Sequence, residues 1–346
     1  HGHPSDLRAV SSPSRSSEEQ LMDWSDVFGG AALIPLLNAA IRLAIPTGLA
    51  AVGESFCQKS GVLNLSVEGM MLTGALTAYL GAYYSGSLWV GVPAGIGGGL
   101  LVGVLMALFT LKFKTEQVIN GIALVLLAQA ATSFTFEELF GDLTLTGRFE
   151  PMKNWEIPGL SSIPGVGTVL FNQSPLVYLS VVLIFAIWYL LNRTMFGLAV
   201  KAVGDRPAAA DAAGISVTRT RWVAILVSGA MSGLGGVVLV VGQLGMFMQN
   251  VTAGRGWVAI ALVIFGRWKP LRVMAGALLF GLTDAIQLRI QAASGGIESN
   301  VPFELFQAMP YLVTIAVVVF ASARARRSGE PEALGRPFFK GAQIEA

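Results

Sequence analysis

The chain has few residues that could form a disulfide or hold a metal ion. Cys57 is its single cysteine, and its two histidines, His1 and His3, lie in a polar stretch at the start. One cysteine cannot form an intrachain disulfide, and a zinc site of the usual cysteine and histidine kind lacks its ligands. We therefore expect no metal site and no cofactor.

Common nucleotide-binding and hydrolase motifs are also absent. The sequence contains no G-x-x-x-x-G-K-[ST] loop, no G-x-S-x-G and no H-E-x-x-H. The first absence excludes ATP binding by a P-loop on this chain, and the others exclude two common hydrolase sites. No histidine is present in the apolar part to act as a base beside a nucleophile. We expect no catalytic residues, so the chain itself is predicted not to be an enzyme.

Charged residues are scarce as well, at 13% of 346 residues, whereas 53% are hydrophobic. The mean hydropathy is +0.64. Soluble globular proteins carry about a quarter charged residues. The net charge of +2 comes from bases dispersed over many loops, which argues against a nucleic-acid partner.

Long apolar runs take the place of charge. Runs of a length that can cross a bilayer recur, so the sequence predicts an all-α polytopic membrane protein of about 8–10 transmembrane or half-spanning helices. Pro35 and Pro46 predict that the first run is broken, and the run at 257–266 is too short to span alone. The runs lie at 28–52, 62–84, 88–111, 117–140, 174–192, 221–243, 257–266, 271–290 and 303–322.

The boundaries of these runs define three parts. Residues 1–26 are polar and are expected to be disordered. Residues 27–323 form the transmembrane domain, and 324–346 form a tail. Basic residues of the short loops favour the cytoplasmic side, which places the 193–221 loop and the C-terminal tail in the cytoplasm and the 141–173 loop outside.

The loop at 193–221 carries a short helix signal. Asp205 and Pro207 suit a helix start, AAADAA is helix-prone, and Gly214 suits a C-terminal cap. A compact helix presented to the cytoplasm by a membrane protein is a surface on which another protein can dock. The alternative is an ordinary loop that turns the chain around.

Small residues recur at four-residue spacing within two runs. Gly95, Gly99 and Gly103 form one series, and Gly229 and Gly233 belong to another. Such spacing allows helices to approach closely, so we expect these glycines to serve helix packing rather than ligand binding.

Polar residues interrupt the apolar runs at two related places. Residues 53–75 contain Glu54, Asn64 and Glu68, and residues 242–270 form a second glycine-rich irregular stretch. A buried carboxylate in lipid needs a proton or a partner, and non-helical backbone there must be enclosed by protein or line a wet cavity. We expect a discontinuous segment near the middle of the bilayer and two halves of a pseudo-symmetric core.

These stretches and two others supply the candidate substrate pathway. For each amide the alternative is a structural hydrogen bond between helices, and Glu54 and Glu68 are equally compatible with bonding the backbone of the broken segment. Neutral amides near aromatic rings suit an uncharged solute that bears hydroxyl or amide groups. The candidates are Glu54, Asn64, Glu68, Gln117, Asn120, Phe247, Asn250, Trp257, Asp284 and Gln287.

Four motifs in this order resemble the permease subunits of ABC importers for nucleosides and simple sugars, within a group that includes ribose-type and branched-chain amino acid permeases. The motifs are GESFCQKSGVLNLSVEGMMLTGA, TEQVINGIAL, AVGDRPAAADAAGISVTRTR and NVTAGRGWVAIALVIFGRWKP, and the resemblance covers about residues 30–322. Glu116 and Val125 depart from the mid-chain motif, which often has Asn there, and this leaves the solute's identity open.

The resemblance implies a multi-pass protein of the cell membrane that works with partners. These are cytosolic ATP-binding subunits, a second permease subunit that is identical or homologous, and an extracytoplasmic substrate-binding protein that meets the 141–173 loop. The ATPase-coupling residues implied are Asp205, Arg206, Pro207, Ala208, Ala209, Asp211 and Gly214.

Two other classes compete with an ABC permease. An ion-coupled secondary transporter would use Glu54, Glu68 or Asp284 as a proton relay. A membrane-embedded enzyme would need a metal or nucleophile constellation that this sequence lacks.

Overall fold

A computed structural model describes residues 30–141, 147–159, 161, 163, 165–293, 308–309, 311–312, 315–316, 319 and 329–339. The predicted disorder of 1–26, the start of the 27–323 domain and most of the run at 303–322 lie outside these residues. Within them the fold is helical, apart from one small antiparallel pair of strands in the 141–173 loop, β1 (Trp155–Glu156) and β2 (Asn172–Gln173).

The predicted runs from 28–52 to 271–290 are helices over most of their described residues. Six are long and apolar enough to cross a membrane in the described part of the chain, which confirms a polytopic all-α fold. The helices are α2 (Gly30–Lys59), α3 (Val67–Ser85), α4 (Leu88–Ala107) with the π-turn η1 (Leu108–Lys112), α5 (Gln117–Phe140), α6 (Val166–Leu170), α7 (Pro175–Arg193), α8 (Met195–Asp205), α9 (Pro207–Ala212), α10 (Val217–Leu239) with η2 (Val240–Leu244), α11 (Arg255–Phe265) and α12 (Pro270–Ala293).

The expectation of a broken first segment is wrong. Pro35 and Pro46 both lie inside the single helix α2. Proline removes one backbone donor, but neighbouring helices allow membrane helices to continue through it. Here α10 packs against α2, and Gly235 of α10 lies directly against the carbonyl of Pro46.

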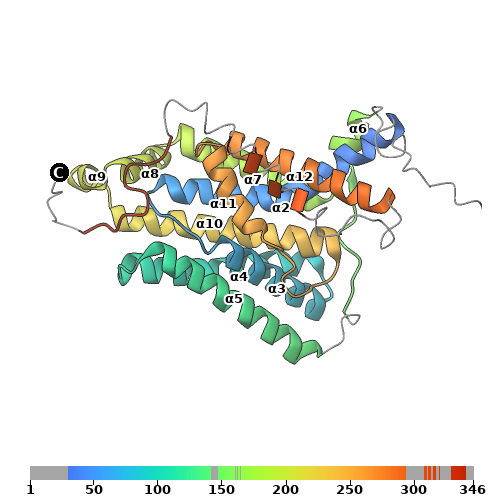
Figure 1. Cartoon of the computed structure of the whole chain (residues 1–346), viewed down its shortest axis with the longest axis horizontal. Helices are drawn as coiled ribbons and strands as arrows, with labels where there is room; N and C mark the ends of the chain where they lie inside the picture. The colour runs from blue at the N-terminus through green and yellow to red at the C-terminus, as the bar shows by residue number, and fades with distance from the viewer. Residues whose placement is uncertain are drawn as a thin grey trace, which may run out of the picture.

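The most buried helix is α10, which packs against α2, α3 and α4 at the centre of the bundle. α12 packs along α2, and α5 lies along one edge of the bundle (Figure 1). In α5, only 28% of the residues in its apolar 18-residue stretch are buried, and the share is the same in α7. Most of the apolar side chains of these two helices therefore face outward. Such faces suit contact with lipid chains.

One helix, α11, begins inside the bundle. After η2 the chain turns back as an irregular segment, and α11 starts at Arg255 partway along α10 (Figure 1). Its 11 residues give a length of about 16 Å, roughly half of a bilayer core. The predicted short segment at 257–266 is therefore a half-spanning helix.

The glycine series lies where α4 crosses α10. A Cβ on Gly99 would sit 2.6 Å from Gly233 Cα and also against the Gly229 carbonyl, whereas a Cβ on Gly97 would meet nothing within 4 Å. The predicted packing role of Gly99, Gly229 and Gly233 is thus confirmed.

Replacing Gly99 with alanine is expected to destabilise the bundle by about 2–3 kcal/mol, because the backbones of α4 and α10 must separate. The matched change Gly97→Ala should stabilise α4 by about 0.5–1 kcal/mol, because alanine is the better helix former. Unfolding of the purified protein in detergent measures both. Equal effects of the two variants would contradict this packing.

Candidate functional site

The helix predicted in the 193–221 loop is present. Pro207 occupies the first turn of α9, and Gly214 follows the helix with φ +84°. The amide of Ile215 donates to Ala210 O at 2.9 Å, which closes the last turn. Proline at the start and glycine after the end are the residues that favour these two positions.

The surface of α9 is small and apolar. Ala209, Ala212 and Ala213 are exposed, whereas Ala210 is buried against Val203 and Val217. Because one face is anchored in a core cluster, the opposite face is held in a fixed orientation. An exposed, rigid patch of alanines suits contact with another protein better than a freely solvated loop would.

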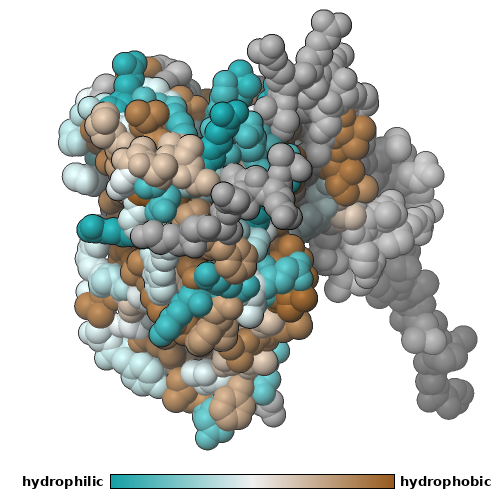
Figure 2. Space-filling view, turned by 90° about the vertical axis from the view of Figure 1, so that its left-hand side faces the viewer, coloured by the Kyte–Doolittle hydropathy of each residue, from teal (hydrophilic) through white to brown (hydrophobic). Residues whose placement is uncertain are grey.

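Basic residues gather at the same end of the molecule. We call the end that carries α8 and α9 the α9 end; Figure 2 looks onto it and shows hydrophilic residues interspersed with apolar ones. The end of α2 and the α11–α12 loop also lie here. Its described bases include Lys59, Lys114, Lys201, Arg206, Arg221, Arg267, Lys269, Arg272 and Arg336.

Residues 329–339 cross the α9 end as an ordered segment, which we call the strap. Ala333 N donates to Gly204 O at 2.9 Å, and Gly335 N donates to Gly61 O at 3.1 Å. Phe338 packs against the cluster that holds Ala210. The strap therefore ties α8 and α9 to the turn after α2, a role that the sequence analysis missed. Its apolar residues within a polar tail were the available signal.

A buried arginine joins the strap to the bundle. Arg221 in α10 is 1% exposed; its Nε donates to Ser60 O at 3.1 Å and its Nη1 to Arg336 O at 3.0 Å. Backbone carbonyls thus accept from two of the three guanidinium nitrogens, which offsets part of the cost of burying this charge. The sequence indicated Arg221 only as one of the loop bases.

A groove of about 440 Å³ lies between the α9 loop and the strap. We call it the coupling groove. Five of the predicted coupling residues line it, together with residues of the strap. Its lining is Asp205, Arg206, Pro207, Ala208, Ala209, Glu332, Ala333, Arg336, Pro337, Phe338 and Phe339. Asp211 and Gly214, also predicted, lie outside this lining.

Glu68 connects the two irregular stretches. Its Oε1 accepts hydrogen bonds from Thr252 Oγ1 at 2.5 Å and Gly254 N at 2.9 Å, and its Oε2 accepts one from Gly256 N at 2.6 Å. Glu68 thereby satisfies the free amides at the start of α11, where a negative charge is favoured. This geometry is what the alternative to a substrate-pathway role requires, namely that Glu68 bonds the backbone of the broken segment. We call this the architectural role.

Glu54 and Asn64 form a second buried cluster with Ser228. Glu54 accepts from Gln58 Nε2 at 3.0 Å, Asn64 N at 3.2 Å and Ser228 Oγ at 2.9 Å. Asn64 also donates to Ser228 Oγ and accepts from Ser66. These bonds join the turn after α2 to α10. Glu54 and Glu68 thus each stabilise backbone that has left a helix.

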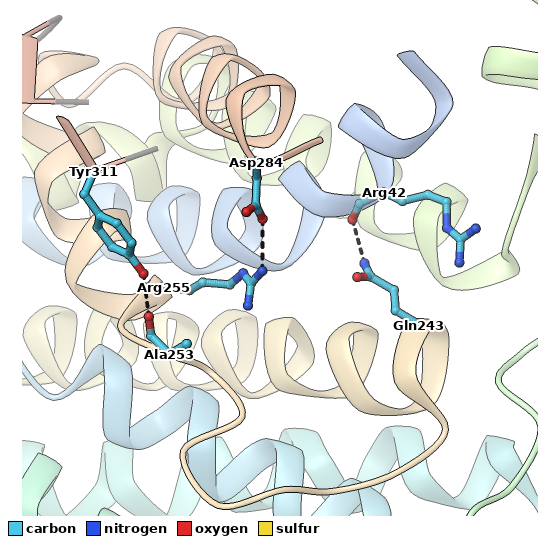
Figure 3. A network of polar contacts seen from close by, with 6 residues as sticks. All are labelled: Arg42, Gln243, Ala253, Arg255, Asp284 and Tyr311. Carbon is cyan, nitrogen blue, oxygen red and sulfur yellow. Dashed lines mark hydrogen bonds and ion pairs between the residues drawn. The ribbon is translucent and has the colours of Figure 1, made fainter. Parts of the chain in front are cut away.

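A third polar group lies between α2, α10, α11 and α12 (Figure 3). We call it the polar wall. The guanidinium of Arg255 pairs with Asp284 at 3.0 Å, and both side chains are more than four-fifths buried. Gln243 Nε2 donates to Arg42 O at 2.6 Å, and Tyr311 Oη donates to Ala253 O at 2.6 Å. Of these residues, the sequence analysis selected Asp284 alone.

The remaining candidates have separate surroundings. Gln117 is buried and accepts from Leu63 N at 2.7 Å; Asn120 bonds Thr115 within the loop before α5. Phe247 is buried among Tyr79, Phe136 and other aromatic rings, and Gln287 is 5% exposed. Asn250 and Trp257 are exposed. None of the ten candidates lines the coupling groove.

Comparison with known proteins identifies this arrangement. Residues 36–320 match the family described as "Branched-chain amino acid transport system / permease component". The match includes the α9 loop, both carboxylate clusters, α2 from residue 36 and the other five described helices able to span a membrane, and it ends before the strap.

Known relatives align with this chain over most of their length. The putative glucose ABC transporter permease protein TsgC13 of Haloferax volcanii is 36% identical over 86% of this chain and 95% of its own. The guanosine ABC transporter permease protein NupQ of Bacillus subtilis is 32% identical over 88% and 97%. The nucleoside ABC transporter permease protein NupC of Lactococcus lactis is 31% identical over 81% and 90%. The chain therefore belongs to this permease family and is a multi-pass, membrane-spanning permease subunit of an ABC transporter.

Proposed function

We propose that this permease imports an uncharged, hydroxyl-bearing solute, either a nucleoside or a simple sugar. The observation that carries the proposal is the agreement among relatives that match more than four-fifths of the chain. Their names specify glucose, guanosine and nucleosides. These solutes share a sugar ring and carry no charge.

The polar wall supports the same chemistry. Arg255 and Asp284 cancel each other's charge at 3.0 Å, and Gln243 and Tyr311 add an amide and a phenol. Amide and hydroxyl groups can donate to and accept from sugar hydroxyls. A free amino acid carries an ammonium and a carboxylate group, which would need an unpaired carboxylate and an unpaired cation in the site. Asp284, the carboxylate of the polar wall, is already paired with Arg255.

The α9 end is proposed to face the cytoplasm. Lysine and arginine residues gather there, and such residues favour the cytoplasmic side of short membrane loops. α9 and the coupling groove would then receive a cytosolic ATP-binding subunit, on which ATP hydrolysis takes place. The 141–173 loop would meet an extracytoplasmic substrate-binding protein, and a second, identical or homologous permease would complete the pathway.

Uptake in cells tests the proposal. In a strain that lacks its own nucleoside and glucose uptake, co-expression of this permease with its partner subunits should accumulate labelled guanosine, uridine or glucose. Labelled leucine should not accumulate. Uptake should stop when ATP is depleted and continue when an uncoupler collapses the ion gradient while ATP is maintained.

Two results would contradict the proposal. Accumulation of leucine alone would assign a different solute class. Loss of uptake on uncoupling, with ATP unchanged, would restore the ion-coupled alternative, which no comparison supports. In that alternative a carboxylate must exchange protons, whereas Glu54, Glu68 and Asp284 are each held by fixed donors.

A further inference from the structure

A second cavity at the α9 end has a basic lining. Its volume is about 460 Å³, and it is enclosed by the end of α2, by α7, α8 and the α11–α12 loop, by the start of α12 and by the first residue of the strap. We call it the basic cavity. Its lining is Lys59, Trp188, Leu191, Asn192, Lys201, Arg267, Trp268, Lys269, Pro270, Leu271, Arg272 and Gly329.

Five cations share this lining, and no carboxylate is part of it. Lys59 is partly buried, donates to Gly329 O at 2.7 Å and lies 6.0 Å from the centre of the Trp268 ring. Among the charged neighbours of Lys59, Asp205 outside the lining has the largest effect and favours its charge, whereas Lys201 and Lys269 oppose it. Like charges grouped beside a low-dielectric wall attract an anion strongly.

The α11–α12 loop holds its bases in an unusual backbone conformation. Arg267 and Trp268 have φ values of +54° and +57°. Trp268 is 6% exposed and its Nε1 donates to Gln58 Oε1 at 2.7 Å. Consecutive non-glycine residues with positive φ persist only where the surroundings impose them, often at ligand sites. The buried indole thus fixes the turn that brings Arg267 and Lys269 to the cavity.

An apolar surface leads to the cavity along α7. Exposed side chains on this helix include Val182 and Phe185, and α7 continues to Trp188 and Leu191 in the lining. Leu271, also in the lining, is 41% exposed. Cationic residues and tryptophan next to an apolar helix face mark the headgroup level of a membrane. An acidic protein side chain would not need this apolar approach.

We propose that the basic cavity binds the phosphate group of an anionic phospholipid, whose acyl chains lie along α7. Phosphate oxygens accept hydrogen bonds from arginine and lysine, and basic cavities between membrane helices on one leaflet suit such headgroups. This site is independent of the solute that the permease carries.

Lipid retention tests the site. The purified permease is exchanged into phosphatidylglycerol or phosphatidylcholine of matched acyl chains, and bound lipid is counted by native mass spectrometry. Wild type should retain phosphatidylglycerol preferentially. The double variant Lys269→Gln, Arg272→Gln should reduce that preference by about 25-fold, because each cation near an anionic surface contributes on the order of a fivefold effect and two are removed. The control, Lys112→Gln with Arg219→Gln, removes two exposed bases outside the lining. This variant should keep the wild-type preference for phosphatidylglycerol.

Other outcomes overturn the proposal. An equal loss in both double variants would show unspecific surface charge, and no lipid preference in wild type would leave the cavity without this ligand. Competition by millimolar inorganic phosphate against bound phosphatidylglycerol would assign the site to a soluble anion. If the cavity variant lowered co-purification of the ATP-binding subunit and left lipid retention unchanged, the occupant would be an acidic side chain of that partner.

Discussion

Replacing Glu68 with alanine is expected to abolish uptake and to lower the free energy of unfolding by about 3 kcal/mol or more. Glu68 accepts three hydrogen bonds, from Thr252, Gly254 N and Gly256 N. Its removal leaves these buried donors without an acceptor, at about 1–3 kcal/mol for each unsatisfied group. Glutamine should restore little, because its amide NH₂ must face one of the same donors.

The readouts separate an architectural role from a substrate-contacting one. Unfolding in detergent reports the stability of the irregular segment, and uptake reports transport. The control Glu138→Ala removes an exposed carboxylate from α5 and should change neither. If Glu68→Ala kept wild-type stability and lost transport alone, Glu68 would contact the solute and the architectural interpretation would be wrong.

Replacing Ala209 with aspartate is expected to uncouple the permease from its ATP-binding subunit. Ala209 is exposed on α9 and lines the coupling groove. A docked partner would bury the new carboxylate without a counter-charge, so the fraction of ATP-binding subunit that co-purifies should fall about tenfold or more. Uptake should fall with it, while the amount of permease in the membrane stays at the wild-type level.

A charge at a neighbouring position provides the control. Thr218 is exposed in the first turn of α10, where a helix favours an acidic side chain. Thr218→Asp adds the same charge at the same end of the molecule and should leave co-purification intact. Recovery of the ATP-binding subunit at wild-type yield with Ala209→Asp would exclude this face of α9 from docking.

The helices were largely predictable because the bilayer imposes their length. The runs at 88–111 and 117–140 correspond to α4 with η1, ending at Lys112, and to α5 at Gln117–Phe140. The short run at 257–266 corresponds to α11. Pro35 and Pro46 led to the wrong prediction of a broken first segment. The stability of a helix at proline depends on its neighbours, which a single sequence does not reveal.

The polar residues were predictable as unusual, but their partners were not. A carboxylate among apolar residues needs a donor, which singled out Glu54 and Glu68. Gln58 and Asn64 lie close to Glu54 in the chain, but other donors lie 174 residues from Glu54 at Ser228 and 184 residues from Glu68 at Thr252. No local pattern encodes such distances. Tyr311 was not selected for the same reason, since its partner Ala253 lies 58 residues earlier in the chain. Arg42 likewise meets its partner Gln243, which is 201 residues away, only in the folded bundle.

The strap has a consequence for biosynthesis. Residues 329–339 follow every described spanning helix in the chain, yet they tie together the turn after α2 and the ends of α8 and α10. A ribosome-bound chain with its spans already inserted still lacks this closure. Closure of the α9 end by the strap therefore waits until residues 329–339 have been translated, after all the described helices that the strap joins.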